Sequence, residues 1–305
     1  MKNIIRAVIH PHKHKRTLPS SNIAQFVADQ LGVELWDCKE KLVYKHIDEL
    51  YYVFGMHAFS DFREEMGALT KKTVKYIHIE NDFTGGNLTQ TERPMREKGS
   101  PAIFLTTIPS RIKNNRGVYI NWNQLTWDPI PVQKLAPLRQ RISGMMYYGA
   151  FRKDRGEPFA RYMSHDLFPL HVYTGRNGKR DFAELNQRIH VNDRADDLIN
   201  TITKHQFSLY IEDAYSTKRY TSPANRFYEC LSAGTPILFD HLAIPTMLEA
   251  GFDVSDFAVS SPKDIVALLP HLDSIYKAQL TWRKTNFKEC LKQDFKEAVS
   301  YIGSL

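Results

Sequence analysis

The sequence predicts an α/β protein with two doubly wound domains, each an open parallel sheet with helices on both faces. Short apolar runs of strand type alternate along the chain with stretches in which apolar residues recur every three to four positions, the period of a helix packed on a sheet. The chain has 305 residues, and 42% of them are hydrophobic. Since a domain averages roughly 150 residues, this length is enough for two hydrophobic cores.

Composition excludes several classes of protein. No apolar run approaches the roughly 18 residues of a membrane span, and the N-terminus lacks the long apolar core of a secretory signal. The cysteines Cys38, Cys230 and Cys290 are odd in number and widely spaced. This spacing argues against a disulfide framework or a zinc site and favours a reducing compartment. We therefore expect a cytoplasmic protein without a membrane partner.

The charge balance favours a polyanionic partner. Lys and Arg number 41 and Asp and Glu 34, so the formal net charge is +7 at pH 7. Basic residues recur in the expected loops of the first half of the chain, together with aromatic residues. Nucleic acid is the first candidate, because cations bind its phosphates and aromatic rings stack on its bases. A solvated basic surface is the alternative.

The first domain is expected to begin with a strand over residues 3–9, followed by the basic loop HPHKHKR. The alternating histidines of this loop favour phosphate contact over a metal site, since no carboxylate or cysteine stands nearby. The helix that follows has an apolar side formed by Ile23, Phe26, Val27 and Leu31. Further strands are expected at residues 50–54, 74–79, 102–105 and 118–120.

A candidate general base follows the strand at residues 74–79. The loop reads ENDFTGG and holds Glu80 and Asp82 beside two glycines. A carboxylate at the carboxyl end of a strand is well placed to take a proton from an acceptor hydroxyl. The same residue types are typical of an ordinary turn. The pattern alone leaves both interpretations open.

A domain boundary is expected near residue 140. The region before it contains Pro129, Pro131 and Pro137, and prolines at this density discourage regular structure and suit a connection between domains. The predicted domains are therefore residues 1–140 and residues 141–305.

Two turns of the second domain have the composition of a phosphate site. A strand at residues 145–148 and another at residues 170–173 each end in a glycine followed by arginine. Backbone amides at a helix start and guanidinium groups together bind a diphosphate, although the pattern is not GxGxxG. The turn residues are Gly149, Ala150, Arg152, Arg155, Gly175 and Arg176.

A third helix start carries charges that suit a nucleotide. A strand at residues 207–211 precedes a helix that opens near Ser222, and a buried strand at residues 236–239 follows it. Arg226 and Glu229 stand three residues apart and share one face of that helix. A cation and a carboxylate placed there suit the phosphates and ribose hydroxyls of a nucleotide. An exposed ion pair is the alternative interpretation.

The chain is expected to end in an amphipathic helix, because Phe287, Leu291, Phe295, Ala298 and Ile302 form one apolar stripe among charged residues. The stripe must pack on a core. That core belongs either to the second domain or, if the helix crosses back, to the first.

Several of these segments also carry a resemblance to a known family. YYGAFR with RGE close behind it, YTGR and NRFYE resemble the donor-binding half of the bacteriophage DNA β-glucosyltransferases, GT-B enzymes that glycosylate hydroxymethylcytosine in DNA. The N-terminal LPSS and the strand with its acids over residues 76–82 are similar to that family too, in the same order. The resemblance covers most of the chain. It implies two Rossmann-like domains that face a central cleft, with a terminal helix that crosses back.

The resemblance implies roles for the donor-site candidates. Arg152, Arg155 and Arg226 would hold the diphosphate of a UDP-sugar, Glu229 would take the ribose hydroxyls, and the backbone around Ile189 would meet uracil.

The resemblance also implies an aspartate base, assigned to Asp82, with Glu80 as the alternative if the loop is matched differently. Two residues depart from the family pattern. Asn22 stands where the family has an acid that contacts the donor sugar, and Ala150 stands where the phosphate loop has a serine. Since an amide and a carboxylate satisfy hydroxyl groups differently, the transferred sugar stays open.

The implied activity is an inverting transfer of a hexose or pentose from UDP to the hydroxymethyl group of a modified pyrimidine in duplex DNA, with 5-hydroxymethylcytosine first. The target nucleotide would be flipped out of the duplex. The resemblance implies no obligatory metal cofactor, and loose binding of Mg²⁺ is compatible with this activity. The protein is expected to be a monomer in the cytoplasm, that of the host if a phage encodes it.

Two other functions remain compatible with the sequence. A GT-B transferase with a polysaccharide, lipid or protein acceptor would keep the donor half and differ in the N-terminal loops. A catalytically inactive nucleic-acid-binding protein would keep the scaffold without binding the donor.

Overall fold

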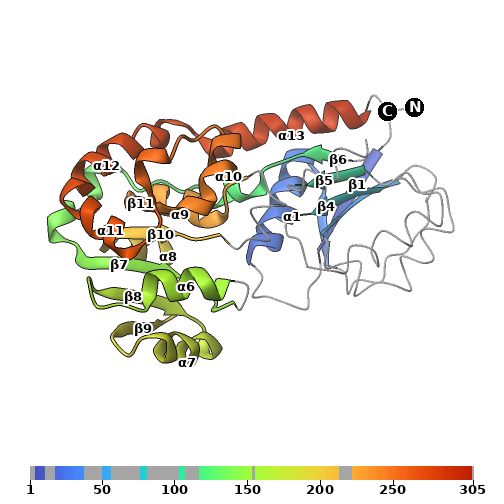
Figure 1. Ribbon diagram of the computed structural model, residues 1–305. Coiled ribbons are helices and arrows are strands. Elements are labelled where there is room, and N and C mark those ends of the chain that lie inside the picture. Colours follow the sequence, from blue (N-terminus) through green and yellow to red (C-terminus); the bar gives the residue numbers. More distant parts are fainter. Residues whose placement is uncertain are drawn as a thin grey trace. The chain divides into compact units, whose positions relative to one another are not determined.

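A computed structural model describes residues 4–10, 18–37, 50–55, 76–80, 103–106, 117–152, 155–212 and 222–303. The chain forms two compact units: unit 1 comprises Met1–Leu125 and Lys288–Leu305, and unit 2 comprises Thr126–Phe287. Each unit contains one six-stranded sheet, and every described strand pairing is parallel (Figure 1).

The division corrects the boundary expected near residue 140, since it lies between Leu125 and Thr126. The proline-rich segment belongs to unit 2 because hydrogen bonds tie it there. Ile130 N donates to Ser232 O at 2.9 Å, and Arg141 Nη1 donates to Gly234 O at 2.8 Å. The prolines limit this segment to short 3-10 helices, such as those at Val132–Lys134 and Leu138–Gln140, but the segment is still attached to the core of unit 2.

The sheet of unit 1 has the order β2-β1-β3-β4-β5-β6. Its strands are β1 (Ile4–His10), β2 (Glu34–Asp37), β3 (Leu50–Gly55), β4 (Tyr76–Glu80), β5 (Ile103–Thr106) and β6 (Gly117–Tyr119). The helix α1 (Leu18–Leu31) stands between β1 and β2 in the chain.

The described core of unit 1 lies between α1 and the C-terminal helix α13 (Phe287–Gly303). α13 buries Leu291, Phe295 and Ala298, which are spaced four and three residues apart as a helix requires. The ring of Phe295 lies 5.8 Å from that of Phe26 on α1. From Lys288 onward the terminal helix therefore packs with unit 1, to which the other end of the chain belongs.

The sheet of unit 2 has the order β12-β11-β10-β7-β8-β9. Its strands are β7 (Ile142–Tyr148), β8 (Leu170–Thr174), β9 (Ile189–Asp193), β10 (His205–Tyr210), β11 (Ile237–Asp240) and β12 (Ala258–Val259). Counted from β7, this is the strand order 3-2-1-4-5-6 of dinucleotide-binding folds, whose order reverses between β7 and β10.

Helices cover both faces of this sheet (Figure 1), and successive side chains of β7 belong to the cores on its two faces. Tyr147 points into one core and Tyr148 into the other. The helices of unit 2 are α6 (Gly156–Met163), α7 (Arg176–Leu185), α8 (Leu198–Thr203), α9 (Asn225–Ala233), α10 (Ile244–Glu249), α11 (Pro262–Leu268) and α12 (Leu272–Gln279). The first core takes residues from α6, α7, α11 and α12, and the second from α8, α9 and α10.

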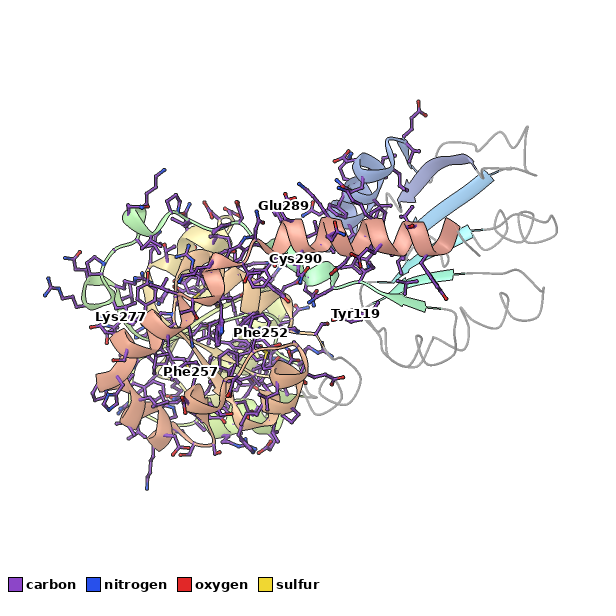
Figure 2. The ribbon with its side chains drawn as sticks, turned by 90° about the horizontal axis from the view of Figure 1, so that it is seen from above. Tyr119, Phe252, Phe257, Lys277, Glu289 and Cys290 are labelled. Atoms are coloured by element: carbon purple, nitrogen blue, oxygen red, sulfur yellow. The ribbon has the colours of Figure 1, made fainter. Side chains whose placement is uncertain are left out.

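Aromatic residues fix α9 in its core. Phe227 of α9 lies 4.6 Å from Phe252, which in turn lies 5.6 Å from Trp282 between ring centroids. Figure 2 shows Phe252 and Phe257 among the packed side chains of unit 2. α9 ends at Ala233, and the next residue, Gly234, has a φ of 58°, the left-handed conformation that glycine adopts at helix ends.

Two further findings concern the described part of the chain. None of its helices combines the length and apolarity that a membrane crossing requires. Its two cysteines, buried Cys230 and exposed Cys290, are free thiols.

Candidate functional site

The carboxyl edge of the unit 2 sheet gathers most of the residues singled out from the sequence. β7 ends at Tyr148 and β10 at Tyr210, and these two strands are neighbours at the point where the strand order reverses. In open α/β sheets, ligands bind beyond the carboxyl ends of the strands at such a point.

Arg226 joins the ends of these two strands. It is the second residue of α9 and only 9% exposed. Its Nη2 donates to the main-chain oxygen of Tyr148 at 2.7 Å, and its Nη1 donates to that of Ile211 at 3.4 Å. The guanidinium carbon also lies 4.4 Å from the ring centroid of Tyr147. A positive charge is therefore fixed at the reversal point of the sheet.

Gly149 and Arg155 lie beside this charge. Gly149 has a φ of +135°, and a Cβ there would stand 3.2 Å from Arg226 Nη2. A residue without a side chain is therefore needed for the turn to approach the guanidinium. Arg155 Nη1 donates to the hydroxyl of Tyr147 at 3.4 Å. Tyr147 thus contacts Arg226 with its ring and Arg155 with its hydroxyl, which brings two cations and the first turn together.

Glu229 is held by a different partner. The Tyr148 hydroxyl donates a hydrogen bond to Glu229 Oε2. Burial raises the pKa of Glu229, while the Tyr148 hydrogen bond and the charges of Arg226 and Arg194 act in the opposite direction. The two charged residues of α9 therefore make separate contacts, Arg226 with main-chain oxygens and Glu229 with a tyrosine, instead of the exposed ion pair that was the alternative.

The start of α9 is fixed by a buried hydroxyl. Ala224, the residue before α9, donates its amide to Tyr210 Oη at 2.7 Å, and the same hydroxyl donates to Glu212. Glu212, two residues after the end of β10, is 6% exposed. No side-chain cap closes the start of α9, which leaves early amides of the helix for a ligand.

The other two turns bring two more helix starts to this edge. α6 follows Arg155 and α7 follows Gly175, and neither has a side-chain cap. Gly178 of α7 packs so closely that a Cβ would stand 3.3 Å from Phe151 N. The first turn of α7, with exposed Gly175 and Arg176, therefore lies against the turn after β7. That turn carries exposed Ala150 and Arg152.

Ile189 does not lie with this group. It is the first residue of β9 and is 7% exposed in the core. It pairs with Leu170, the first residue of β8, so it lies at the amino edge of the sheet. The residues of β9 at the carboxyl edge are Asn192 and Asp193, because Asp193 pairs with Thr174.

Sequence reasoning missed two residues of the group, Arg194 and Tyr148. Arg194 follows β9 and its charge acts on Glu229. Arg194 could have been found as a charged residue at the carboxyl end of a strand, but the short, polar strand β9 was not predicted from the sequence. Tyr148 was given no role of its own at the site, since nothing in the chain order indicates that it faces α9.

Three candidates belong to unit 1. Asn22 is exposed on α1. Glu80 is the last residue of β4, as the sequence placed it at a strand end. Asp82 lies outside the described residues.

Within the ranges that the structure describes, no group of three or more His, Cys, Asp or Glu side chains is arranged to hold a metal ion.

Solved structures of other proteins align with nearly the whole chain. The DNA-modifying enzyme β-glucosyltransferase, solved in the presence and absence of uridine diphosphoglucose, is 13% identical with a TM-score of 0.65, over 99% of this chain and 100% of its own. T4 phage BGT in complex with UDP and Mn²⁺ is 15% identical with a TM-score of 0.64 over the same shares. The chain has the β-glucosyltransferase fold.

A mutant of T4 phage BGT in complex with UDP-glucose agrees, at 11% identity and a TM-score of 0.66 over 99% of this chain and 100% of its own. The GT-B class expected from the sequence is confirmed, as is the resemblance to β-glucosyltransferase at the level of the fold. A scan against protein-family models finds no match, and neither does a search of curated proteins.

Proposed function

We propose that the chain is a glycosyltransferase that uses a UDP-sugar and binds its nucleotide at the carboxyl edge of the unit 2 sheet. The observation that carries this proposal is the convergence of Gly149, Arg155, Arg226 and Glu229 at the reversal point between β7 and β10. Two cations beside uncapped helix starts suit a diphosphate, and a carboxylate suits ribose hydroxyls. Structures of the same fold hold UDP or UDP-glucose.

The phosphate-binding residues divide into fixed and exposed groups. Arg226 commits two nitrogen atoms to main-chain oxygens, so it acts mainly as a fixed charge that lowers the energy of the leaving UDP. Arg152 and Arg176 are exposed on adjacent turns and bind phosphate oxygens directly. The backbone of Gly149, Ala150 and Gly175 supplies amides.

The base and sugar contacts complete the donor site. Uracil meets the carboxyl end of β9 around Asn192, since the sheet places Ile189 at the opposite edge. Glu229 binds the ribose hydroxyls. Asn22 of α1 contacts the transferred sugar, which therefore need not be glucose.

The acceptor is the hydroxymethyl group of a modified pyrimidine in DNA, with 5-hydroxymethylcytosine first. A net charge of +7 and the DNA-modifying activity named for the enzyme of the same fold support this acceptor. Asp82, or Glu80 in its place, takes the hydroxyl proton as the oxygen bonds to the anomeric carbon. The bond from that carbon to UDP breaks, the electron pair leaves with UDP, and the configuration inverts.

The direct test is an assay of UDP-sugars on modified DNA. Full-length protein would be incubated with UDP-glucose, UDP-galactose, UDP-N-acetylglucosamine or UDP-xylose and with duplexes that contain 5-hydroxymethylcytosine, 5-hydroxymethyluracil or neither. Nucleoside mass analysis should show one sugar added to one hydroxymethylated nucleoside and none on unmodified DNA. Parallel reactions with Mg²⁺, Mn²⁺ or EDTA measure any need for a divalent ion.

The other outcomes of this assay are informative too. Hydrolysis of a UDP-sugar without a DNA product would favour a polysaccharide, lipid or protein acceptor. Absence of nucleotide binding would contradict the proposal and favour a binding protein on a transferase scaffold. In the same assay Asp82→Asn should reduce turnover roughly 100-fold or more while leaving the Kd for UDP within about twofold, the size expected for loss of a general base. If Glu80→Gln has that effect instead, Glu80 is the base.

A further inference from the structure

Tyr148 contacts both charged residues of α9. Its main-chain oxygen accepts from Arg226 Nη2 at 2.7 Å, and its ring centroid lies 5.1 Å from the guanidinium carbon. Its hydroxyl donates to Glu229 Oε2. Tyr148 is itself only 9% exposed and packs in the second core, so the hydroxyl has little freedom to move.

The hydrogen bond from Tyr148 determines which oxygen of Glu229 is left for a ligand. Glu229 is half-buried, and its Oε2 is occupied by the Tyr148 hydroxyl. Its Oε1 accepts no hydrogen bond among the described residues. A glutamate on a helix has three side-chain torsions, and fixing one oxygen removes most of that freedom before a ligand arrives.

We propose that Tyr148 is a positioning residue for ribose selectivity: it directs Glu229 Oε1 at the ribose hydroxyls, so that the site prefers a ribonucleotide to a 2′-deoxyribonucleotide. This inference rests on the proposed function, because it assumes that UDP binds at this edge. The ligand group is a vicinal diol, which can donate two hydrogen bonds to a carboxylate.

Tyr147 provides a matched comparison on the same strand. It points to the opposite face of the sheet, and its hydroxyl accepts from Arg155 Nη1 at 3.4 Å. Its ring stacks on Arg226. Tyr147 therefore contacts the two cations of the site, besides packing on Phe159 and Phe182, whereas the hydroxyl of Tyr148 hydrogen-bonds the carboxylate of Glu229.

The experiment compares Tyr148→Phe with Tyr147→Phe in the full-length protein. Calorimetry would give the Kd for UDP, 2′-deoxy-UDP and UMP. We expect the wild type to prefer UDP over 2′-deoxy-UDP by about tenfold, since hydrogen bonds to a charged group are the stronger class. Tyr148→Phe should reduce this preference at least threefold and leave the ratio of UDP to UMP unchanged. Tyr147→Phe should reduce the ratio of UDP to UMP and leave the ribose preference unchanged.

A double-mutant cycle separates positioning from a structural effect. Tyr148→Phe removes one oxygen and keeps the ring, and Tm measurements would report any loss of packing. Glu229→Gln should abolish the ribose preference, and Tyr148→Phe should have no further effect on that preference in the Glu229→Gln background. If Tyr148→Phe folds poorly, Glu229→Gln still tests the proposal. A retained preference for UDP over 2′-deoxy-UDP in Glu229→Gln would show that Glu229 does not bind the ribose hydroxyls and would overturn the proposal.

The possible failures are distinguishable. A wild-type protein that binds none of the three nucleotides would overturn the proposed function. A wild-type protein that prefers UDP over 2′-deoxy-UDP, with Tyr148→Phe showing the same preference, would overturn the role of Tyr148 alone.

Discussion

The charged residues at the reversal point of the unit 2 sheet are positioned by backbone and tyrosine groups, not by each other. Arg226 donates to the main-chain oxygens that end β7 and follow β10. Glu229 accepts from Tyr148. A cation and an anion that are each held separately keep their remaining hydrogen-bonding capacity for a ligand, which an ion pair between them would have consumed.

Gly149→Ala tests this geometry at a single residue. A φ of +135° strains any residue with a side chain, and the new Cβ would stand 3.2 Å from Arg226 Nη2. We expect the free energy of unfolding to fall by roughly 1–3 kcal/mol and UDP binding to weaken because Arg226 is displaced. Denaturant unfolding and calorimetry measure the two effects.

The matched control is Gly156→Ala. Gly156 is the first residue of α6, and no atom lies within 4 Å of a Cβ placed there. Alanine favours a helix more than glycine does, so stability should be unchanged or slightly higher. Equal losses of UDP affinity in both variants would show that Gly149 has no special contact with Arg226.

At the scale of elements, the sequence predicted long periodic segments well and short polar ones poorly. α1 and α13 were evident from apolar spacing, and both bury the residues expected, such as Val27 and Phe295. β2 was missed because its four residues begin and end with an acid. β9 was missed because it is a polar edge strand, so the edge of the sheet at which Ile189 lies was not predicted.

The candidate site was predictable in its turns and not in its contacts. Glycine and arginine after successive strands identified Gly149, Arg155 and Gly175 from local pattern alone. The contact between Tyr148 and Glu229 depends on β7 lying beside β10. Strand order in a sheet is not given by order along the chain, so only the folded arrangement shows this pair.

α13 yields a prediction at the scale of elements. Phe295 is 2% exposed, and its ring lies 5.8 Å from Phe26 and 6.3 Å from Trp122. Phe295→Ala should destabilise unit 1 by roughly 3–5 kcal/mol, the usual cost of such a cavity. The Kd for UDP should be unchanged, because the proposed contacts of UDP are all in unit 2. Thermal unfolding and calorimetry on one preparation provide both measurements.

Lys296→Ala is the control on the same helix. Lys296 is exposed beside Phe295, so its loss should change stability by no more than about 0.5 kcal/mol. Loss of UDP binding in Phe295→Ala, with unit 2 still folded, would contradict the assignment of the nucleotide to unit 2.

At the scale of the whole molecule, the two units divide the proposed chemistry. Unit 2 has a hydrophobic core on each face of its sheet and carries every residue assigned to the nucleotide. Asn22, Glu80 and Asp82 belong to unit 1. Nucleotide binding and turnover are therefore expected to be separable by mutation, with losses of affinity in unit 2 and losses of rate in unit 1.

The most direct test is a crystal structure of the protein with UDP. We expect the diphosphate between the Gly149 turn and the start of α9, beside Arg155 and Arg226, with the ribose hydroxyls on Glu229. UDP bound away from the carboxyl edge of the unit 2 sheet, or no UDP bound at millimolar concentration, would contradict the assignment.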